Sequence, residues 1–149
     1  MGVIRPVFAL IVPEISSPQG AVAENDRSPG RLAGCPRKPN CVSSEAADSG
    51  HNVTPLQLKG DPSAAWEGIH AIVDRLPRST IVAHTAHYLH AEVKSRLFRF
   101  VDDLELLWDP ATDRVAIRSA SRLGYSDLGV NRRRVEDLRR ELKRADLIR

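Results

Sequence analysis

The chain has 149 residues, of which 42% are hydrophobic and 28% are charged, and its formal net charge is +3. This length predicts a single domain with a terminal segment, and the composition is ordinary for a globular protein. The basic excess is local, because residues 131–149 hold eight Lys and Arg against four Asp and Glu, with no aromatic residue among them. That pattern is typical of a solvated helix face, so nucleic acid is not an expected partner.

The first 31 residues form a signal-like segment. Arg5 precedes a short apolar run at residues 7–12, and residues 21–23 spell Ala-Val-Ala, a pattern after which signal peptidase cuts. The apolar run is short and ends at Pro13, so a disordered tail is the alternative interpretation. No run approaches the ~20 apolar residues that span a bilayer. We therefore expect an exported, periplasmic protein without a transmembrane segment, with a cytoplasmic location as the alternative.

The only two cysteines, Cys35 and Cys41, lie within residues 13–60, a polar segment without sustained periodicity that predicts loop or extended chain. Two cysteines alone do not complete a structural zinc site, and their spacing is not that of a C-x-x-C redox pair. "LAGC" at residues 32–35 matches a lipobox, but a polar stretch separates it from the apolar run. We expect a disulfide, worth about 2.4 kcal/mol by loop closure, in an oxidising compartment. Two reduced thiols in a cytosolic loop are the alternative.

Residues 61–77 predict the first helix. Asp61 is a favourable N-cap, Pro62 suits the first helical position, and Pro77 ends the pattern. Apolar residues recur at steps of three and four, which predicts one buried face made of Ala65, Trp66, Ile69, Ile72, Val73 and Leu76.

Residues 79–122 predict four antiparallel strands. The segment 79–95 is too long for one typical strand. We divide it near Thr85 into a hairpin, with one bent strand as the alternative. The next strands, 98–108 and 115–121, are joined by the turn-rich link "DPATDR". Their apolar faces coincide when Trp108 lies opposite Val115, Leu106 opposite Ile117, Leu104 opposite Ser119, Asp102 opposite Ser121 and, on the outer face, Glu105 opposite Arg118.

A second helix is predicted from about residue 132 to 147. Asn131 is a natural N-cap, and the buried stripe is Val135, Leu138, Leu142 and Ala145. The expected fold is therefore α+β: a single domain over residues 32–149, in which a four-stranded antiparallel meander has an N-terminal and a C-terminal helix packed on one face.

The stretch 118–134, together with Asp102, contains the candidate ligand-binding residues. Three arginines in a helix's first turn oppose its macrodipole, which favours negative charge there. Either an anion bound to the helix amides or an internal carboxylate would offset them. The candidates are Asp102, Arg118, Ser119, Ser121, Arg122, Tyr125, Asp127, Asn131, Arg132 and Arg133.

Asp102 is predicted to face the apolar side of the sheet beside Ser119 and Ser121. It either hydrogen-bonds there as scaffolding or acts as an acid or base in a pocket. His90 with Glu92, and Asp103 with Glu105, share faces as metal ligands would, although charged outer sheet faces look the same. We therefore expect no metal and no cofactor.

Four motifs resemble a known family: "CPRKPNCVSS", "YLHAE", "FVDDLE" and "SASRLGYSDLGVNRRRVEDLR". Together they are similar to the domain-of-unknown-function family 1499, over residues 32 to about 145. The resemblance implies these domain limits and a non-cytosolic setting, since the family occurs in bacteria and plant plastids, often behind an export or transit signal. The family has no established activity, so the resemblance assigns no catalytic residue.

Three functions remain open at this point. The first is a non-enzymatic binding module for a small anionic ligand or a protein partner, using the 118–134 loop. The second is a hydrolase-like enzyme that uses Asp102 with Ser121 or Tyr125. The third is a structural accessory domain whose polar cluster is internal.

Overall fold

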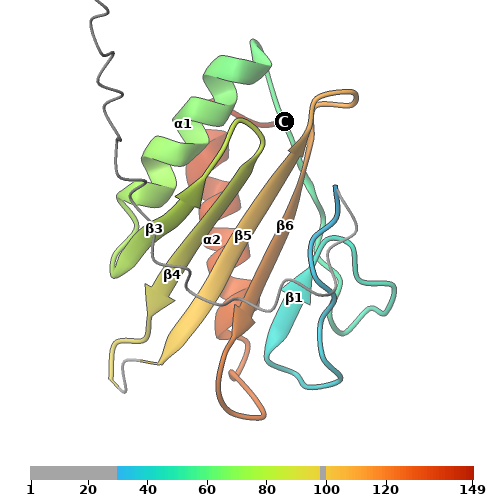
Figure 1. Ribbon diagram of the computed structural model, residues 1–149, viewed down its shortest axis with the longest axis vertical. Helices are drawn as coiled ribbons and strands as arrows, with labels where there is room; N and C mark the ends of the chain where they lie inside the picture. Colours follow the sequence, from blue (N-terminus) through green and yellow to red (C-terminus); the bar gives the residue numbers. More distant parts are fainter. Residues whose placement is uncertain (1–29, 98–99) are drawn as a thin grey trace, which may run out of the picture.

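The computed structural model describes residues 30–97 and 100–149. The signal-like pattern and Phe98 of the expected third strand lie outside these residues. Over the described part the chain forms an α+β fold with two helices and one antiparallel sheet of six strands (Figure 1). The elements are β1 (Cys41–Ser43), β2 (Leu56–Gln57), α1 (Pro62–Asp74), β3 (Ser79–His84), β4 (Tyr88–Lys94), β5 (Val101–Asp109), β6 (Arg114–Ser121) and α2 (Val130–Arg144).

The four long strands form the expected meander, with the order β6-β5-β4-β3. The hairpin division near Thr85 is confirmed, because β3 ends at His84 and pairs antiparallel with β4. The register of β5 with β6 is also confirmed: Asp102 lies opposite Ser121, Glu105 opposite Arg118, Leu104 opposite Ser119, Leu106 opposite Ile117 and Trp108 opposite Val115. Alternation of apolar side chains thus sets the register, since a slip of one residue would turn an apolar set outward.

The expected number of strands is wrong, because the sheet has six strands and not four. Both extra strands pair with β6: Cys41 lies opposite Ala120 and Leu56 opposite Val115. They come from the segment that was expected to be loop or extended chain. Strands of three and two residues are too short to show a period of two, so alternation could not reveal them.

Helix α1 begins as expected, because the Asp61 carboxylate accepts a hydrogen bond from the Ala64 amide at 3.0 Å. For α2 the expected N-cap is wrong. The helix begins at Val130 after Gly129, which has a positive φ of 79°, and Asn131 is buried inside the first turn. Ala145 is exposed beyond the last turn and is not part of the buried stripe. Among the described residues, neither helix has the length and hydrophobicity needed to cross a bilayer.

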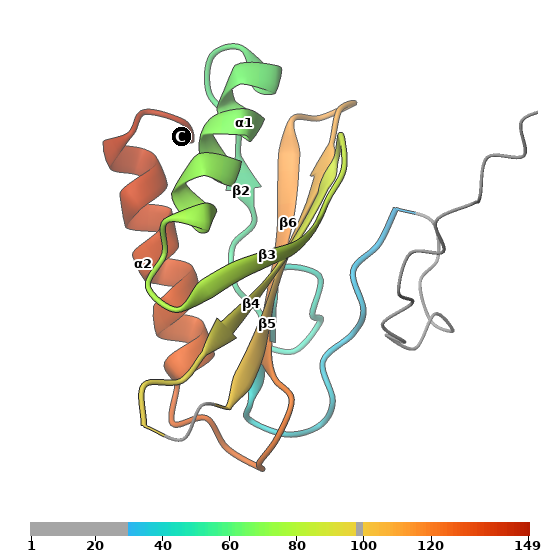
Figure 2. The same cartoon turned by 60° about the vertical axis from the view of Figure 1, so that its left-hand side comes forward.

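One hydrophobic core joins the sheet to both helices. In Figure 2 the two helices lie on one side of the sheet, and the segment from residue 30 to 40 runs along the other side. Trp66 and Ile69 of α1 and Leu138 of α2 are almost completely buried in this core. The sheet contributes mainly aliphatic side chains, which include Leu89, Ala91, Leu104, Leu106, Val115 and Ile117.

The expected disulfide between Cys35 and Cys41 is confirmed. Cys41 is the first residue of β1, so the bond fastens the segment before β1 to the edge of the sheet. Asn40, between the cysteines, accepts through its carbonyl from the Ser121 amide at 2.9 Å and donates through Nδ2 to the Gly124 carbonyl at 2.9 Å. The stapled loop therefore braces the loop that leads from β6 to α2.

Candidate functional site

A buried polar cluster lies where the start of β5 and the end of β6 meet the first turn of α2. Asp102 is buried, and Arg134 Nη2 donates to its Oδ2 at 2.6 Å. Arg134 Nη1 also donates to Ser119 Oγ at 3.1 Å and to Asn131 Oδ1 at 2.7 Å. A carboxylate without such partners would cost several kcal/mol to bury. Arg134, which was not among the candidate residues, therefore makes the inward position of Asp102 possible.

Asn131 is the centre of this cluster and is fully buried. Its Oδ1 accepts from Ser119 Oγ at 2.7 Å, and its Nδ2 lies 2.8 Å from Ser121 Oγ and 2.7 Å from Asp127 Oδ2. Nδ2 also reaches the Asn40 carbonyl at 3.2 Å. One amide side chain thus connects strand β6, the helix and the stapled loop.

The start of α2 is capped by Asp127. Its carboxylate accepts from the Gly129 amide at 2.8 Å and from the Asn131 amide at 3.0 Å. Negative charge is favourable at a helix N-terminus. An internal carboxylate therefore occupies the position at which a bound anion was the other expectation, and it does the capping that was assigned to Asn131.

The other candidate arginines point away from this cluster. Arg132 donates to the carbonyls of Asn52 and Gly50, both at 2.9 Å, and Arg133 donates to the Leu128 carbonyl at 3.0 Å. These two arginines therefore bind the backbone of neighbouring loops. Of the ten candidates, the structure brings together Asp102, Ser119, Ser121, Asp127 and Asn131, and it places Arg118, Arg122, Tyr125, Arg132 and Arg133 elsewhere.

Arg118 and Arg122 belong to an ionic network on the opposite face of the sheet. Arg118 Nη1 donates to Glu105 Oε2 at 3.0 Å, and the Tyr88 hydroxyl donates to Glu105 Oε1 at 2.6 Å. Arg122 Nη2 reaches Asp103 at 2.8 Å and Glu92 at 2.6 Å, while His90 Nε2 lies 2.7 Å from Asp103. The acidic residues considered as metal ligands are thus paired with cations and a phenol, and no group of three or more potential ligands in the described residues is arranged for a metal.

Asp103 is the most strongly perturbed carboxyl of that network. Burial alone would raise its pKa, but hydrogen bonds from His90 and Arg122, together with their positive charges, hold the pKa well below its ordinary value. Hydrogen bonds to Asp103 and Glu92, together with their negative charges, raise the pKa of Arg122. Asp103 and Arg122 therefore remain an oppositely charged pair over the physiological pH range.

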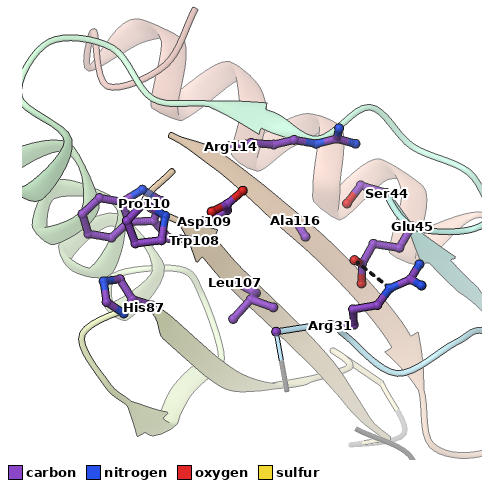
Figure 3. Close-up of a pocket in the computed structure, with 11 residues that line it drawn as sticks. Arg31, Ser44, Glu45, His87, Leu107, Trp108, Asp109, Pro110, Arg114 and Ala116 are labelled. Carbon is purple, nitrogen blue, oxygen red and sulfur yellow. Dashed lines mark ion pairs between the residues drawn. The ribbon is translucent and has the colours of Figure 1, made fainter. Parts of the chain in front are cut away.

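A shallow hollow of about 560 Å³ lies on the same outer face, near the other end of β5 and β6. Figure 3 shows Leu107 and Ala116 at its base, Trp108 and His87 at one side, and the Arg31–Glu45 ion pair at the other. The Arg31 and Glu45 side chains are 3.6 Å apart. Asp109 is engaged within the turn after β5. The Thr112 hydroxyl and the Ala111 amide donate hydrogen bonds to its carboxylate and lower its pKa. The hollow thus holds no set of polar groups that converges on one point.

Exposed apolar side chains gather at one end of the molecule, which we call the loop end. It consists of residues 95–97 and Phe100 between β4 and β5, the loop between β6 and α2, and the first residue of α2, at the bottom of Figure 1. Leu97 and Leu128 are each 83% exposed, and Tyr125 is 68% exposed. Of the seven large exposed hydrophobic side chains in the described residues, six lie here: Leu97, Phe100, Leu123, Tyr125, Leu128 and Val130.

Sequence reasoning included Tyr125 but missed the leucines of the loop end. Each leucine lies in a turn or loop next to glycine, serine or arginine, so no periodic pattern marks it. Only the approach of the two loops across the start of β5 and the end of β6 unites them, as the hydrogen bond from the Arg122 amide to the Val101 carbonyl shows. The one signal available in the sequence was that these leucines lie in loops, where no helical or strand pattern predicts that they are buried.

A groove of about 470 Å³ adjoins the loop end on the helix side. It lies between the first half of α2, the end of β4 and the turn after α1. Val93, Val130 and Leu138 line it together with Leu76 and Pro77, and its basic members include Lys94, Arg96 and Arg133. The groove is more apolar than polar, so it extends the apolar surface of the loop end.

Comparison with known proteins supports the resemblance seen in the four motifs. No curated protein and no solved structure matches the chain. The model of a family described as "Protein of unknown function (DUF1499)" matches residues 31–142, which is well over half of the chain. The chain therefore belongs to the DUF1499 family of proteins of unknown function.

Proposed function

We propose that the domain at residues 32–149 is a non-enzymatic binding module that docks on its partner through the loop end. The observation that carries this proposal is the gathering of exposed Leu97, Leu123, Tyr125 and Leu128 side chains on two adjacent loops. Large apolar side chains exposed together on a soluble domain usually mark an interaction site. The proposal keeps the 118–134 loop as the binding region but assigns recognition to its apolar residues.

The polar cluster supports this proposal as a scaffold. Asn131 and Arg134 tie β5, β6 and α2 together directly beneath the loop that carries Leu123 and Leu128. A loop held at both ends presents its side chains with little loss of entropy on binding. The proposal thus keeps one part of the accessory-domain hypothesis, namely that the polar cluster is internal and structural.

The small-anion alternative has less support. Arg132 and Arg133 are engaged with backbone carbonyls, and the first amides of α2 are engaged with Asp127. An anion would have to displace these contacts. A ligand that did so would need to replace hydrogen bonds that already have good geometry.

The hydrolase-like alternative also has little support. Asp102 is buried, and its carboxylate is engaged by the Arg134 guanidinium. Ser121 Oγ accepts from Asn131 Nδ2, and Tyr125 lies on the exposed surface. Neither residue makes a hydrogen bond to Asp102 that would serve as a nucleophile–base contact.

The disulfide supports an exported, periplasmic location for this module. The Cys35–Cys41 bond would persist only in an oxidising compartment, because cytosolic thiols are kept reduced. A docking partner would then be found outside the cytosol.

Site-specific photo-crosslinking in intact cells tests the proposal. A benzoylphenylalanine at residue 128 is compared with one at residue 82, because Val82 is exposed on β3, away from the loop end. We expect an adduct at residue 128, to either a lipid or a protein, that is absent at residue 82 and that disappears when Leu123→Ser is added. The same adducts at both positions, or none at residue 128, would contradict a docking role for the loop end.

A further inference from the structure

We infer that the partner of the loop end is an anionic membrane surface, on which the domain sits peripherally. This inference rests on the proposed function and names its partner. It requires three features together: apolar side chains able to enter the headgroup region, cations placed around them, and no acidic side chain left free to repel the surface.

The apolar side chains protrude from separate loops. Leu97 belongs to the turn after β4, and Leu123, Tyr125 and Leu128 belong to the loop after β6. Aromatic side chains with a polar tip, such as tyrosine, are favoured at the membrane interface. The loops thus present several short apolar insertions around a tyrosine.

Unpaired cations surround these insertions. Lys94 and Arg96 come shortly before Leu97 in the chain, and Arg37 and Lys38 lie in the stapled loop that contacts residues 124 and 127. All four are exposed and form no ion pair within the described residues. Cations close to an anionic leaflet attract it strongly, so this arrangement is complementary to such a surface.

Acidic side chains around the loop end are already engaged. Asp127 caps α2, and both Asp103 and Glu92 are paired with Arg122. Asp137, beside the groove, is paired with Arg140. The free charge that the loop end presents is therefore positive, which favours an anionic surface over a neutral or a basic one.

The adjoining groove strengthens the inference. Val93, Val130 and Leu138 line it, and Lys94, Arg96 and Arg133 also border it. An apolar groove with cations at its rim suits an acyl chain whose headgroup is anionic. A flat protein partner would leave this groove unfilled.

Vesicle sedimentation with the full, oxidised chain tests the inference. Wild type is mixed with vesicles of phosphatidylcholine alone or of phosphatidylcholine with phosphatidylglycerol. We expect binding to the phosphatidylglycerol vesicles that weakens as salt is added. Lys94→Ala/Arg96→Ala should weaken it by about tenfold or more. Leu123→Ser/Leu128→Ser should weaken it to a similar extent, while the matched control Val82→Ser should bind like wild type.

The variants share the same first 29 residues, so a difference between them reports on the loop end. Equal binding to both kinds of vesicle, no binding to either, or binding that the two double variants leave intact would each overturn the inference. A protein adduct at residue 128, or a dimer in sedimentation velocity that Leu128→Ser abolishes, would also overturn the membrane as partner but would leave the docking role of the loop end standing. Loss of both vesicle binding and the residue-128 adduct would remove the docking role as well.

Discussion

At the scale of single residues, Arg134 holds the polar cluster together. Its guanidinium contacts Asp102 of β5, Ser119 of β6 and Asn131 of its own helix. The Asp102 and Arg134 side chains are only 6% and 13% exposed, so solvent screens this pair weakly. The inward carboxylate and its cation must therefore be understood as one unit.

We expect Arg134→Ala to lower the free energy of unfolding by about 3 kcal/mol or more, because it leaves the Asp102 carboxylate buried without a charge partner. Asp102→Asn/Arg134→Met, which removes both charges, should recover much of that loss. Urea unfolding of the three proteins measures this. If Arg134→Ala were as stable as wild type, the Asp102–Arg134 pair would contribute nothing to the free energy of unfolding.

Asp103 makes stability depend on acid pH. Its pKa in the folded protein lies below the ordinary value of about 3.9, so the unfolded chain takes up protons first as the pH falls. The stabilisation is complete above that value and is lost as the pH falls below it through the folded pKa. We expect the unfolding free energy of wild type to fall more steeply below about pH 4 than that of Asp103→Asn.

At neutral pH Asp103→Asn should be less stable than wild type by roughly 1–3 kcal/mol, because His90 and Arg122 lose a charged acceptor. Unfolding curves at several pH values would compare the two proteins. Parallel pH profiles of the two proteins would show that Asp103 does not cause the loss of stability in acid.

At the scale of elements, the sequence predicts best those parts whose pattern is long. Helix α1 follows from Asp61, Pro62 and the apolar spacing, and the β5–β6 register follows from alternation over several residues. Strands β1 and β2 could not be predicted, because their pairing depends on β6 and not on a local period. The N-cap of α2 was misassigned because Asp127, three residues before the helix, supplies the cap through its side chain.

The candidate site was predictable only in part, for a similar reason. The alternation of apolar side chains along the two strands predicts that Asp102 faces inward beside Ser121, and the structure has this pairing. Its partner Arg134 lies on helix α2. The alternation along the strands does not specify how that helix is rotated against the sheet, so it could not place Arg134 beside Asp102. The leucines of the loop end belong to no period, so only the fold brings them together.

The disulfide should stabilise the edge at β1. Cys35→Ser/Cys41→Ser is expected to lower the unfolding free energy by about 2.4 kcal/mol, because the unfolded chain loses a closed loop. Chemical denaturation measures the change. A reducing agent should destabilise wild type and leave the double variant unchanged, and insensitivity of wild type would contradict a stabilising role.

At the scale of the whole molecule, the chain separates stability from recognition. The core of sheet and helices and the ionic network on the outer face fix the fold, whereas the loop end carries most of the large exposed apolar side chains among the described residues. Leu123 and Leu128 cost little to change, since neither is part of the core. Their exposure in an otherwise ordinary domain is what the proposed docking explains.

Amide hydrogen exchange of the full, oxidised chain, with and without phosphatidylglycerol vesicles, tests the central claim most directly. It reports on every backbone segment at once and needs no substitution. The account predicts slower exchange at residues 122–130 and in the turn after β4 when vesicles are present, with exchange in β3 unchanged. Unchanged exchange at residues 122–130, or protection centred on β3 and α1, would contradict it.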